Sequence, residues 1–290
     1  MMESLSEKYE KLKRFIEDKG RNGVVIAFSG GVDSSTLAAI CYQVLGERAV
    51  AVTAKSATYP SEEMIDAQKI ASEIGIRHYV VETDELSRRD FIRNPEDRCY
   101  YCKKDLLGHL QDLAKELAFK AIFEGTNFSD LSGHRPGFKA VREAKNIFSP
   151  WAENGFTKEE IRILARKLGL SVHSKPALAC LASRIPFGEK ITKERLDRVG
   201  RAEQLIKKIS GVQQLRVRDH NGLARIEVGR DERSLFFTVE IMDKISEELK
   251  QLGFKFATLD LEGYRTGSML LDLEGSTASA LRTARSSQLS

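Results

Sequence analysis

The sequence of 290 residues has few cysteines, no long apolar run and no large excess of either charge. Every apolar stretch is shorter than the roughly 20 residues of a membrane-spanning helix, so we expect no membrane segment. The N-terminus lacks the apolar core of a signal peptide, which makes structural disulfides among the four cysteines unexpected and favours thiol chemistry or metal binding. The net charge of +4 is too small to predict nucleic-acid binding. We therefore expect a soluble, cytoplasmic protein.

The first half of the chain alternates short apolar runs with segments of helical spacing. Such runs are typical of strands buried on both faces of a parallel sheet, and they occupy residues 23–28, 49–53, 76–81 and 120–124. Helices are predicted between them over residues 36–45, 61–74 and 102–117. This order predicts βαβ units, and hence an α/β fold with a doubly wound parallel sheet.

The pattern changes in the second half. A Thr-x-x-Glu capping box at Thr157 predicts a helix to residue 168. Further on, two strand-like runs flank the turn signal Asn221-Gly222, and helices are predicted over 192–209 and 231–252. We divide the chain into a first domain at 1–180, a smaller C-terminal α+β domain for substrate binding or oligomerisation at 181–272, and a disordered tail at 273–290.

A glycine- and serine-rich segment, Ser29-Gly-Gly-Val-Asp-Ser-Ser35, follows the first apolar run and precedes the helix expected from Thr36. Glycines permit a tight turn, and the free N–H groups at a helix start favour an anion. Asp33 suits a divalent cation that bridges it to a phosphate. The lysine of a Walker A loop is missing. We interpret the segment as a phosphate-binding loop rather than an ordinary serine-rich turn.

A second polar segment, Glu124-Gly-Thr-Asn127, follows the apolar run at 120–124. Ligands of open α/β sheets bind at the carboxyl ends of the strands. Gly125 would permit close approach of a ligand, and Thr126 and Asn127 could contact a nucleotide or substrate. The alternative is a turn built from ordinary turn-forming residues.

The cysteines form the third candidate site. Cys99-Tyr-Tyr-Cys102 is compatible with a redox pair, a zinc half-site or an iron–sulfur half-site. With Cys180, three thiols lie in polar segments, which suits a [4Fe–4S] cluster with one open iron. A zinc site needs a fourth ligand, which His109 or His173 could supply. Cys41 lies in an apolar helix and is expected in the core.

The segment Ser29–Ser35 resembles the PP-loop of the ATP pyrophosphatases. This resemblance implies that the loop holds the β,γ-pyrophosphate of ATP, with Mg²⁺ bound at Asp33, and that the reaction is adenylation. The residues it implies for ATP binding are Ser29, Gly30, Gly31, Asp33, Ser34 and Ser35 of the loop, with Gly125, Thr126 and Asn127 of the second segment.

Three segments of the second half, Thr157–Gly169, Lys175–Gly188 and Gly263–Ser268, resemble the LarE family of ATP-dependent sulfur transferases. The resemblance runs from about residue 10 to about residue 270. It implies that the enzyme adenylates a carboxylate of pyridinium-3,5-biscarboxylic acid mononucleotide and replaces AMP with sulfur to give the thiocarboxylate. Asp33 and Cys180 would be the catalytic residues.

The family has two branches that differ in the source of sulfur. In one branch the cysteine that matches Cys180 gives up its own sulfur. In the other, three cysteines hold a [4Fe–4S] cluster with a labile sulfide. Because Cys99 and Cys102 accompany Cys180, the chain resembles the cluster branch. The resemblance also implies a sulfide or other sulfur donor as a partner, and a homo-oligomer.

Basic residues of the second half fit an anionic nucleotide substrate. Arg216 and Arg218 alternate on a predicted strand, so both side chains face one side. Guanidinium groups suit phosphate and carboxylate, although a solvated surface arginine is the alternative at each position. The candidate substrate-binding residues are Arg135, Ser183, Arg184, Arg216, Arg218, Arg225 and Arg265.

Two other functions fit parts of the sequence. A tRNA thiolase with the same loop and an iron–sulfur cluster would need a basic groove, and the nearly balanced charge disfavours it. A non-catalytic nucleotide- or metal-binding regulator would bind ATP but release no pyrophosphate when substrate is added.

Overall fold

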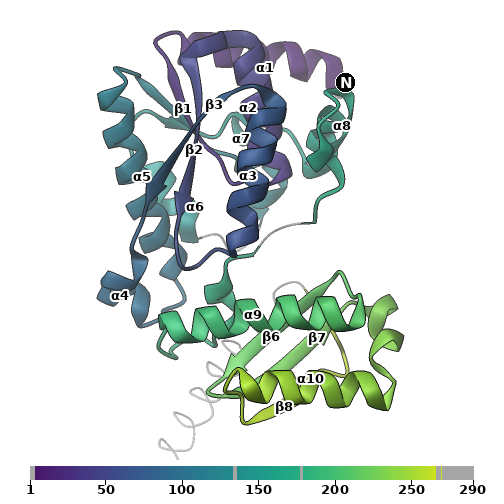
Figure 1. Cartoon of the computed structure of the whole chain (residues 1–290). Coiled ribbons are helices and arrows are strands. Elements are labelled where there is room, and N and C mark those ends of the chain that lie inside the picture. The colour runs from purple at the N-terminus through teal and green to yellow at the C-terminus, as the bar shows by residue number, and fades with distance from the viewer. Residues whose placement is uncertain (1–3, 133–135, 177–178, 266–268, 270–290) are drawn as a thin grey trace, which may run out of the picture. The chain divides into compact units, whose positions relative to one another are not determined.

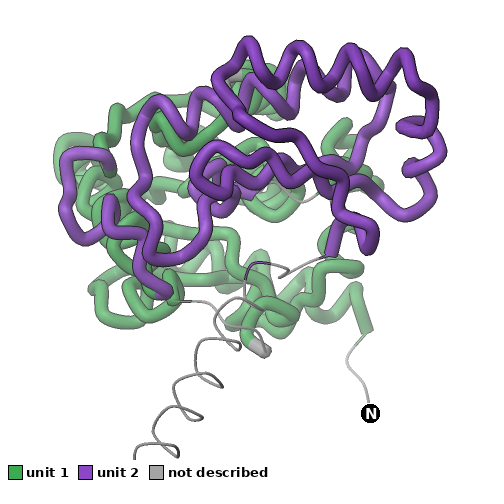
Figure 2. The backbone as a smooth tube through the Cα atoms, turned by 90° about the horizontal axis from the view of Figure 1, so that it is seen from below, with its two compact units in different colours: residues 1–85, 97–178 green, residues 86–96, 179–290 purple. Residues whose placement is uncertain are grey.

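The computed structural model describes residues 4–132, 136–176, 179–265 and 269. The chain forms two compact units (Figures 1 and 2). The first consists of Met1–Glu85 and Asp97–Leu178, and the second of Leu86–Glu96 and Ala179–Ser290. The predicted substrate-binding residue Arg135 and the predicted tail at 273–290 lie outside the described residues.

The first unit is built on a five-stranded sheet in which every pair of neighbours is parallel. The strand order is β3-β2-β1-β4-β5. The strands are β1 (Val24–Ala27), β2 (Ala49–Lys55), β3 (Arg77–Glu82), β4 (Ala121–Phe123) and β5 (Ile147–Phe148). The predicted α/β fold is thus confirmed. Because the order reverses between β1 and β4, the loops that follow these two strands flank the switch point where such sheets bind ligands.

Helices cover both faces of this sheet (Figure 1). The helices are α1 (Leu5–Gly20), α2 (Val32–Leu45), α3 (Ser61–Ile74), α5 (Arg98–Glu116), α6 (Pro136–Glu143), α7 (Pro150–Glu153) and α8 (Lys158–Lys167). Short 3-10 turns of this unit are η1 (Gly46–Arg48), η3 (Phe128–Ser132) and η4 (Ser171–Ser174), and η2 (Glu85–Ser87) begins at the last residue of its first segment. Alternate residues of β1 point to opposite faces, so Val24 and Ile26 pack with α1, α2 and α8, whereas Val25 packs with α5 and α6.

Several helix starts differ from the sequence prediction. The capping box at Thr157 is confirmed, since Thr157 and Glu160 each accept from the other's backbone N–H. However, α2 begins at Val32 rather than Thr36, and α5 begins at Arg98 rather than Cys102. Neither start has a side-chain cap, because Gly31 and Asp97 at the cap positions make no such hydrogen bond. Asp33 and the C-x-x-C pair therefore lie within helices rather than before them.

The second unit has a three-stranded sheet in the order β6-β7-β8. Its strands are β6 (Leu215–His220), β7 (Leu223–Val228) and β8 (Phe256–Leu259), and its helices are α4 (Arg89–Ile92), α9 (Lys193–Ser210) and α10 (Val239–Gln251). The 3-10 turns are η5 (Leu181–Arg184) and η6 (Arg230–Phe236). The turn predicted at Asn221-Gly222 joins β6 and β7, and both residues have positive φ. The single helix predicted over 231–252 is wrong, because η6 ends first and Thr238 caps a separate α10.

Residues 86–96 belong to the second unit although the first unit continues after them. Backbone hydrogen bonds hold them there, from Gly188 to the carbonyl of Asn94 and from Ile191 to that of Ile92, each 2.9 Å long. The buried amide of Asn94 also donates to the carbonyls of Ile185 and Pro186.

No helix within the described part of the chain is both long enough and apolar enough to cross a membrane.

Candidate active site

The loop after β1 is held by its own serines. Ser34 Oγ accepts from the backbone N–H of Ser29 at 3.1 Å and lies 3.1 Å from Ser29 Oγ. Gly30 has a φ of +69°, and a Cβ there would lie 2.9 Å from the Cα of Ala67 in α3. Only glycine fits such a position. Because Gly31 supplies no side-chain cap to α2, the N–H groups of its first turn are left to bind an anion.

Asp33, in the first turn of α2, contacts three residues that are distant in sequence. Its Oδ2 forms an ion pair with Lys158 Nζ, and its Oδ1 accepts from Asn127 Nδ2 at 3.3 Å. Its backbone carbonyl accepts from the Trp151 indole at 3.0 Å. A cation therefore lies at the start of α2 beside the carboxylate. The sequence pattern did not indicate Lys158 as a site residue. The one local feature that could have drawn attention to Lys158 is its position directly after Thr157, the residue that caps α8.

The second segment lies against this loop. A Cβ on Gly125 would lie 3.3 Å from the backbone nitrogen of Ser34 and 3.4 Å from Asp33 Cβ, so a larger residue would push the two loops apart. Asn127 is buried and contacts Asp33. The structure thus brings Gly125 and Asn127 to the glycine-rich loop, as expected for loops that flank one switch point.

Glu124 is buried just before Gly125 and was not a candidate from the sequence. Its carboxylate accepts from Lys103 Nζ at 2.9 Å, from the Thr126 hydroxyl at 2.8 Å and from the Ser149 hydroxyl. Burial raises the pKa of Glu124, but the charge of Lys103 and these hydrogen bonds outweigh it and bring the pKa below its ordinary value. The carboxylate therefore stays ionised at the base of the turn.

The cysteines occupy three settings. Cys99 is exposed in the first turn of α5, and Cys102, one turn further along, is half-buried with its Sγ 3.8 Å from Glu85 Oε1. Cys180, in the second unit, is half-buried at the cap position of η5. Cys41 lies in the core as predicted, and burial raises the pKa of its thiol. Within the described residues, no three His, Cys, Asp or Glu side chains gather into a metal site, with or without His109 and His173.

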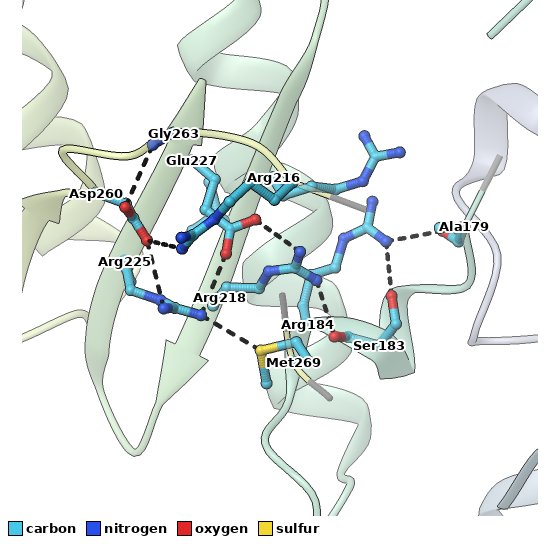
Figure 3. A network of polar contacts seen from close by, with 12 residues as sticks. Ala179, Ser183, Arg184, Arg216, Arg218, Arg225, Glu227, Asp260, Gly263 and Met269 are labelled. Atoms are coloured by element: carbon cyan, nitrogen blue, oxygen red, sulfur yellow. Dashed lines mark hydrogen bonds and ion pairs between the residues drawn. The ribbon is translucent and has the colours of Figure 1, made fainter. Parts of the chain in front are cut away.

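In the second unit, Arg184 is buried and its guanidinium is fully used within the protein (Figure 3). It pairs with Glu203 through two bonds of 2.8 and 3.0 Å, and donates to the carbonyls of Ala179 and Cys180 and to Ser183 Oγ. Burial raises the pKa of Glu203, but Arg184 outweighs this and brings it below the ordinary value. The pair fixes the backbone at Cys180.

Three further arginines are paired with carboxylates (Figure 3). Arg218 donates to Glu227 at 2.7 Å and to the carbonyl of Ser183 at 3.0 Å. Arg225 bridges Glu227 and Asp260, at 3.2 and 3.4 Å. Arg265 also approaches Asp260 and pairs with Glu262. These contacts place most of the predicted basic residues on one side of the second unit.

Arg216 differs from its neighbours. Its guanidinium donates to the carbonyl of Leu215 and lies 5.2 Å from the centre of the Tyr264 ring, but it makes no ion pair with a carboxylate of the described residues. Burial lowers the pKa of Arg216, and the nearby charge of Arg184 lowers it further. Arginine still remains charged at neutral pH, so Arg216 is a partly buried cation suited to an anionic ligand.

Comparison with known proteins gives relatives that match most of the chain. The family model described as NAD synthase matches residues 4–94. An uncharacterised protein of Synechocystis is 42% identical over 91% of this chain and 97% of its own length. The pyridinium-3,5-bisthiocarboxylic acid mononucleotide synthase of Lactiplantibacillus plantarum is 35% identical over 92% of this chain and 95% of its own. The tRNA-specific 2-thiouridylase MnmA of Rickettsia prowazekii is 29% identical over 53% of this chain and 52% of its own.

Proposed function

The chain belongs to the family of the pyridinium-3,5-bisthiocarboxylic acid mononucleotide synthase, and from that membership we propose that it is an ATP-dependent sulfur transferase. In this proposal ATP adenylates a carboxylate of pyridinium-3,5-biscarboxylic acid mononucleotide. Pyrophosphate leaves, sulfur attacks the acyl carbon, and AMP leaves as the thiocarboxylate forms. A second round on the other carboxylate would complete the product named for the Lactiplantibacillus relative.

The observation that carries the proposal is the cation and open helix start at Asp33. The first turn of α2 and Lys158 offer N–H groups and a positive charge to the β,γ-pyrophosphate. Asp33, partly exposed, fits Mg²⁺, which binds through one or two carboxylates together with substrate phosphates. Magnesium would balance the phosphate charge as the adenylate forms. When ATP binds, the ammonium group of Lys158 would leave the Asp33 carboxylate and pair with a phosphate group instead.

For the substrate we propose that Arg216 binds the phosphate or a carboxylate directly. It is the predicted basic residue that makes no ion pair with a carboxylate of the described residues, although the charge of Glu203 acts on it from farther away. Arg184, Arg218, Arg225 and Arg265 would shape the site through their fixed pairs, and the hydroxyl of Ser183 would lie among them. We assign direct binding to Arg216 alone because the other four guanidinium groups already donate to carboxylates of the protein.

For the sulfur we propose that Cys99, Cys102 and Cys180 hold a [4Fe–4S] cluster. Two of the three thiols lie one helical turn apart in α5, and neither Cys99 nor Cys102 is fully buried, which fits two thiolate ligands of one cluster. When bound, the cluster would supply a labile sulfide as nucleophile. The alternative is that Cys180 gives up its own sulfur, in which case Cys99 and Cys102 are dispensable.

Two assays test these proposals. We expect the wild type to catalyse ATP–pyrophosphate exchange that depends on the pyridinium substrate, and Asp33→Asn to lose this activity. If the wild type shows no exchange, the function that remains is that of a nucleotide-binding regulator. Iron and acid-labile sulfide, measured after anaerobic purification, should fall in Cys99→Ala, Cys102→Ala and Cys180→Ala alike. A protein without iron that loses the sulfur of Cys180 in one turnover would instead favour the sacrificial route.

We also propose that the enzyme is a homo-oligomer that takes sulfide or another sulfur donor from solution. Light scattering of the purified protein measures the first. Dependence of repeated turnover on added sulfide measures the second.

A further inference from the structure

Lys103 lies between the two cysteines of α5 and the nucleotide loops. It directly follows Cys102, and its Nζ lies 2.9 Å from Glu124 Oε2. The side chain of Lys103 is 24% exposed, whereas that of Glu124 is 2% exposed. The second turn of α5, directly after the C-x-x-C pair, is therefore joined by one ion pair to a buried carboxylate at the end of β4.

Glu124 is the fixed end of this pair. Besides Lys103, its carboxylate accepts from the Ser149 hydroxyl and from both the hydroxyl and the backbone N–H of Thr126. A carboxylate so deeply buried needs a cation, because removing one partner of a buried ion pair leaves an uncompensated charge. The conformation of Thr126 thus depends on the Glu124 carboxylate, and the cation that balances this carboxylate is Lys103 of α5.

The turn after Glu124 is in direct contact with the glycine-rich loop. Gly125 packs against the backbone nitrogen of Ser34 so closely that a Cβ would lie 3.3 Å from it. Asn127 donates to Asp33. The same backbone therefore contacts the start of α2 on one side and, through Glu124, the second turn of α5 on the other.

The first two turns of α5, which carry Cys99, Cys102 and Lys103, are also confined by α6. A Cβ on Gly137 would lie 3.3 Å from the carbonyl oxygen of Cys99 and 3.6 Å from Lys103 Cβ. Because α6 packs this closely, the turn cannot move independently of both neighbours. A shift of the Glu124 carboxylate would be passed to Cys99 and Cys102 through Lys103.

We propose that Lys103 is a positioning residue that couples occupancy of the ATP site to the order of the cysteine-bearing turn. The inference rests on the proposed ATP site at Asp33 and Gly125. A nucleotide that fixes Gly125 and Thr126 also fixes Glu124, and the ion pair transmits this order to α5. Coupling free energies are reciprocal, so the state of the cysteine turn would change ATP affinity by the same factor.

Hydrogen–deuterium exchange of the full-length chain tests this coupling with Mg·ATP as the probe. In the wild type, Mg·ATP should slow exchange in a peptide spanning residues 98–104 by at least about fivefold. In Lys103→Met/Glu124→Gln, which removes both charges and leaves no buried ion unpaired, the slowing should fall below about twofold. Lys103→Arg, which keeps the cation, should restore most of it. ATP affinity is measured on the same samples by calorimetry.

The matched control is Lys8→Met/Glu160→Gln, which removes an ion pair of 2.9 Å between α1 and α8. It should retain the full slowing at residues 98–104. If the Lys103/Glu124 double variant binds ATP and keeps the full slowing, or if the wild type binds ATP without slowing, the coupling is refuted while the ATP site stands. If the wild type does not bind Mg·ATP, the proposed function is overturned and the coupling with it.

Discussion

Lys158 and Asp33 form an ion pair across 125 positions of sequence, at the point where α2 begins. Lys158 is the first residue of α8, and Asp33 lies in the first turn of α2. The pair places a partly exposed cation beside a helix start that already favours anions. An arriving triphosphate can take the lysine from Asp33, while Mg²⁺ takes the carboxylate.

Lys158→Met should therefore weaken the use of ATP. The variant loses the cation at the phosphate position, so we expect kcat/KM for ATP to fall about 100-fold. Lys158→Arg should lose less, because it keeps the charge. Pyrophosphate exchange measures both. Lys8→Met serves as control, since Lys8 pairs with Glu160 of the same helix and not with Asp33. An unchanged kcat/KM in Lys158→Met would remove Lys158 from the phosphate site.

Arg216→Met should affect the pyridinium substrate and not ATP. Loss of a charge-assisted contact is worth about 10- to 100-fold in affinity, so KM for the mononucleotide should rise by that factor at constant KM for ATP. Arg230→Met is the control, because Arg230 is an exposed arginine of the same unit. Steady-state kinetics with each substrate varied in turn separates the two constants. Equal rises in both would indicate a general structural role.

Arg184→Ala should destabilise the protein. Glu203 would be left as a buried charge, and Ala179, Cys180 and Ser183 would lose a shared donor. Breaking a buried pair in this way costs about 3–5 kcal/mol of unfolding free energy, measured by urea titration. The double variant Arg184→Met/Glu203→Gln should recover much of that loss. A single variant as stable as the wild type would mean that the pair does not hold this segment.

Stability in acid should depend on Asp219. Its buried carboxylate accepts from the Gly222 N–H at 2.8 Å and pairs with Arg195 and Arg198. Burial raises the pKa of Asp219, but these partners outweigh it and set the pKa below its ordinary value. Its stabilising contribution is thus complete above the unfolded pKa, about 4, and disappears as the pH falls through the lower folded pKa.

Urea unfolding of wild type and Asp219→Asn across this range gives the check. The wild type should lose stability more steeply than the variant as the pH falls below about 4. Parallel curves for the two proteins would show that Asp219 does not contribute to the acid transition.

The sequence predicted the loops after β1 and β4 well because both signals are local. Apolar runs mark the strands, and glycines mark the turn at Gly30 and the close backbone approach at Gly125. It did not predict Lys158 or Lys103 as site residues, since each matters only through a carboxylate that the fold brings to it. Charged side chains on helices are usually solvated, and their spacing does not distinguish these two.

The sequence also predicted the first residues of several helices poorly. The starts of α2 and α5 lack side-chain caps, so neither has the usual signal. The break before α10 had one, because Thr238 accepts from the N–H of Ile241, but the apolar spacing continued through it and predicted one long helix. The sequence identifies the arginines only as basic residues, and only the fold distinguishes the guanidinium of Arg184, which is paired with Glu203, from that of Arg216.

The most direct test of the account is product formation under anaerobic conditions. The protein is incubated with pyridinium-3,5-biscarboxylic acid mononucleotide, Mg·ATP and sulfide, and the nucleotides are identified by mass spectrometry. We expect exchange of a carboxylate oxygen for sulfur, with one AMP and one pyrophosphate formed for each sulfur transferred, and neither in Asp33→Asn. ATP binding without AMP, pyrophosphate or thiocarboxylate would contradict it.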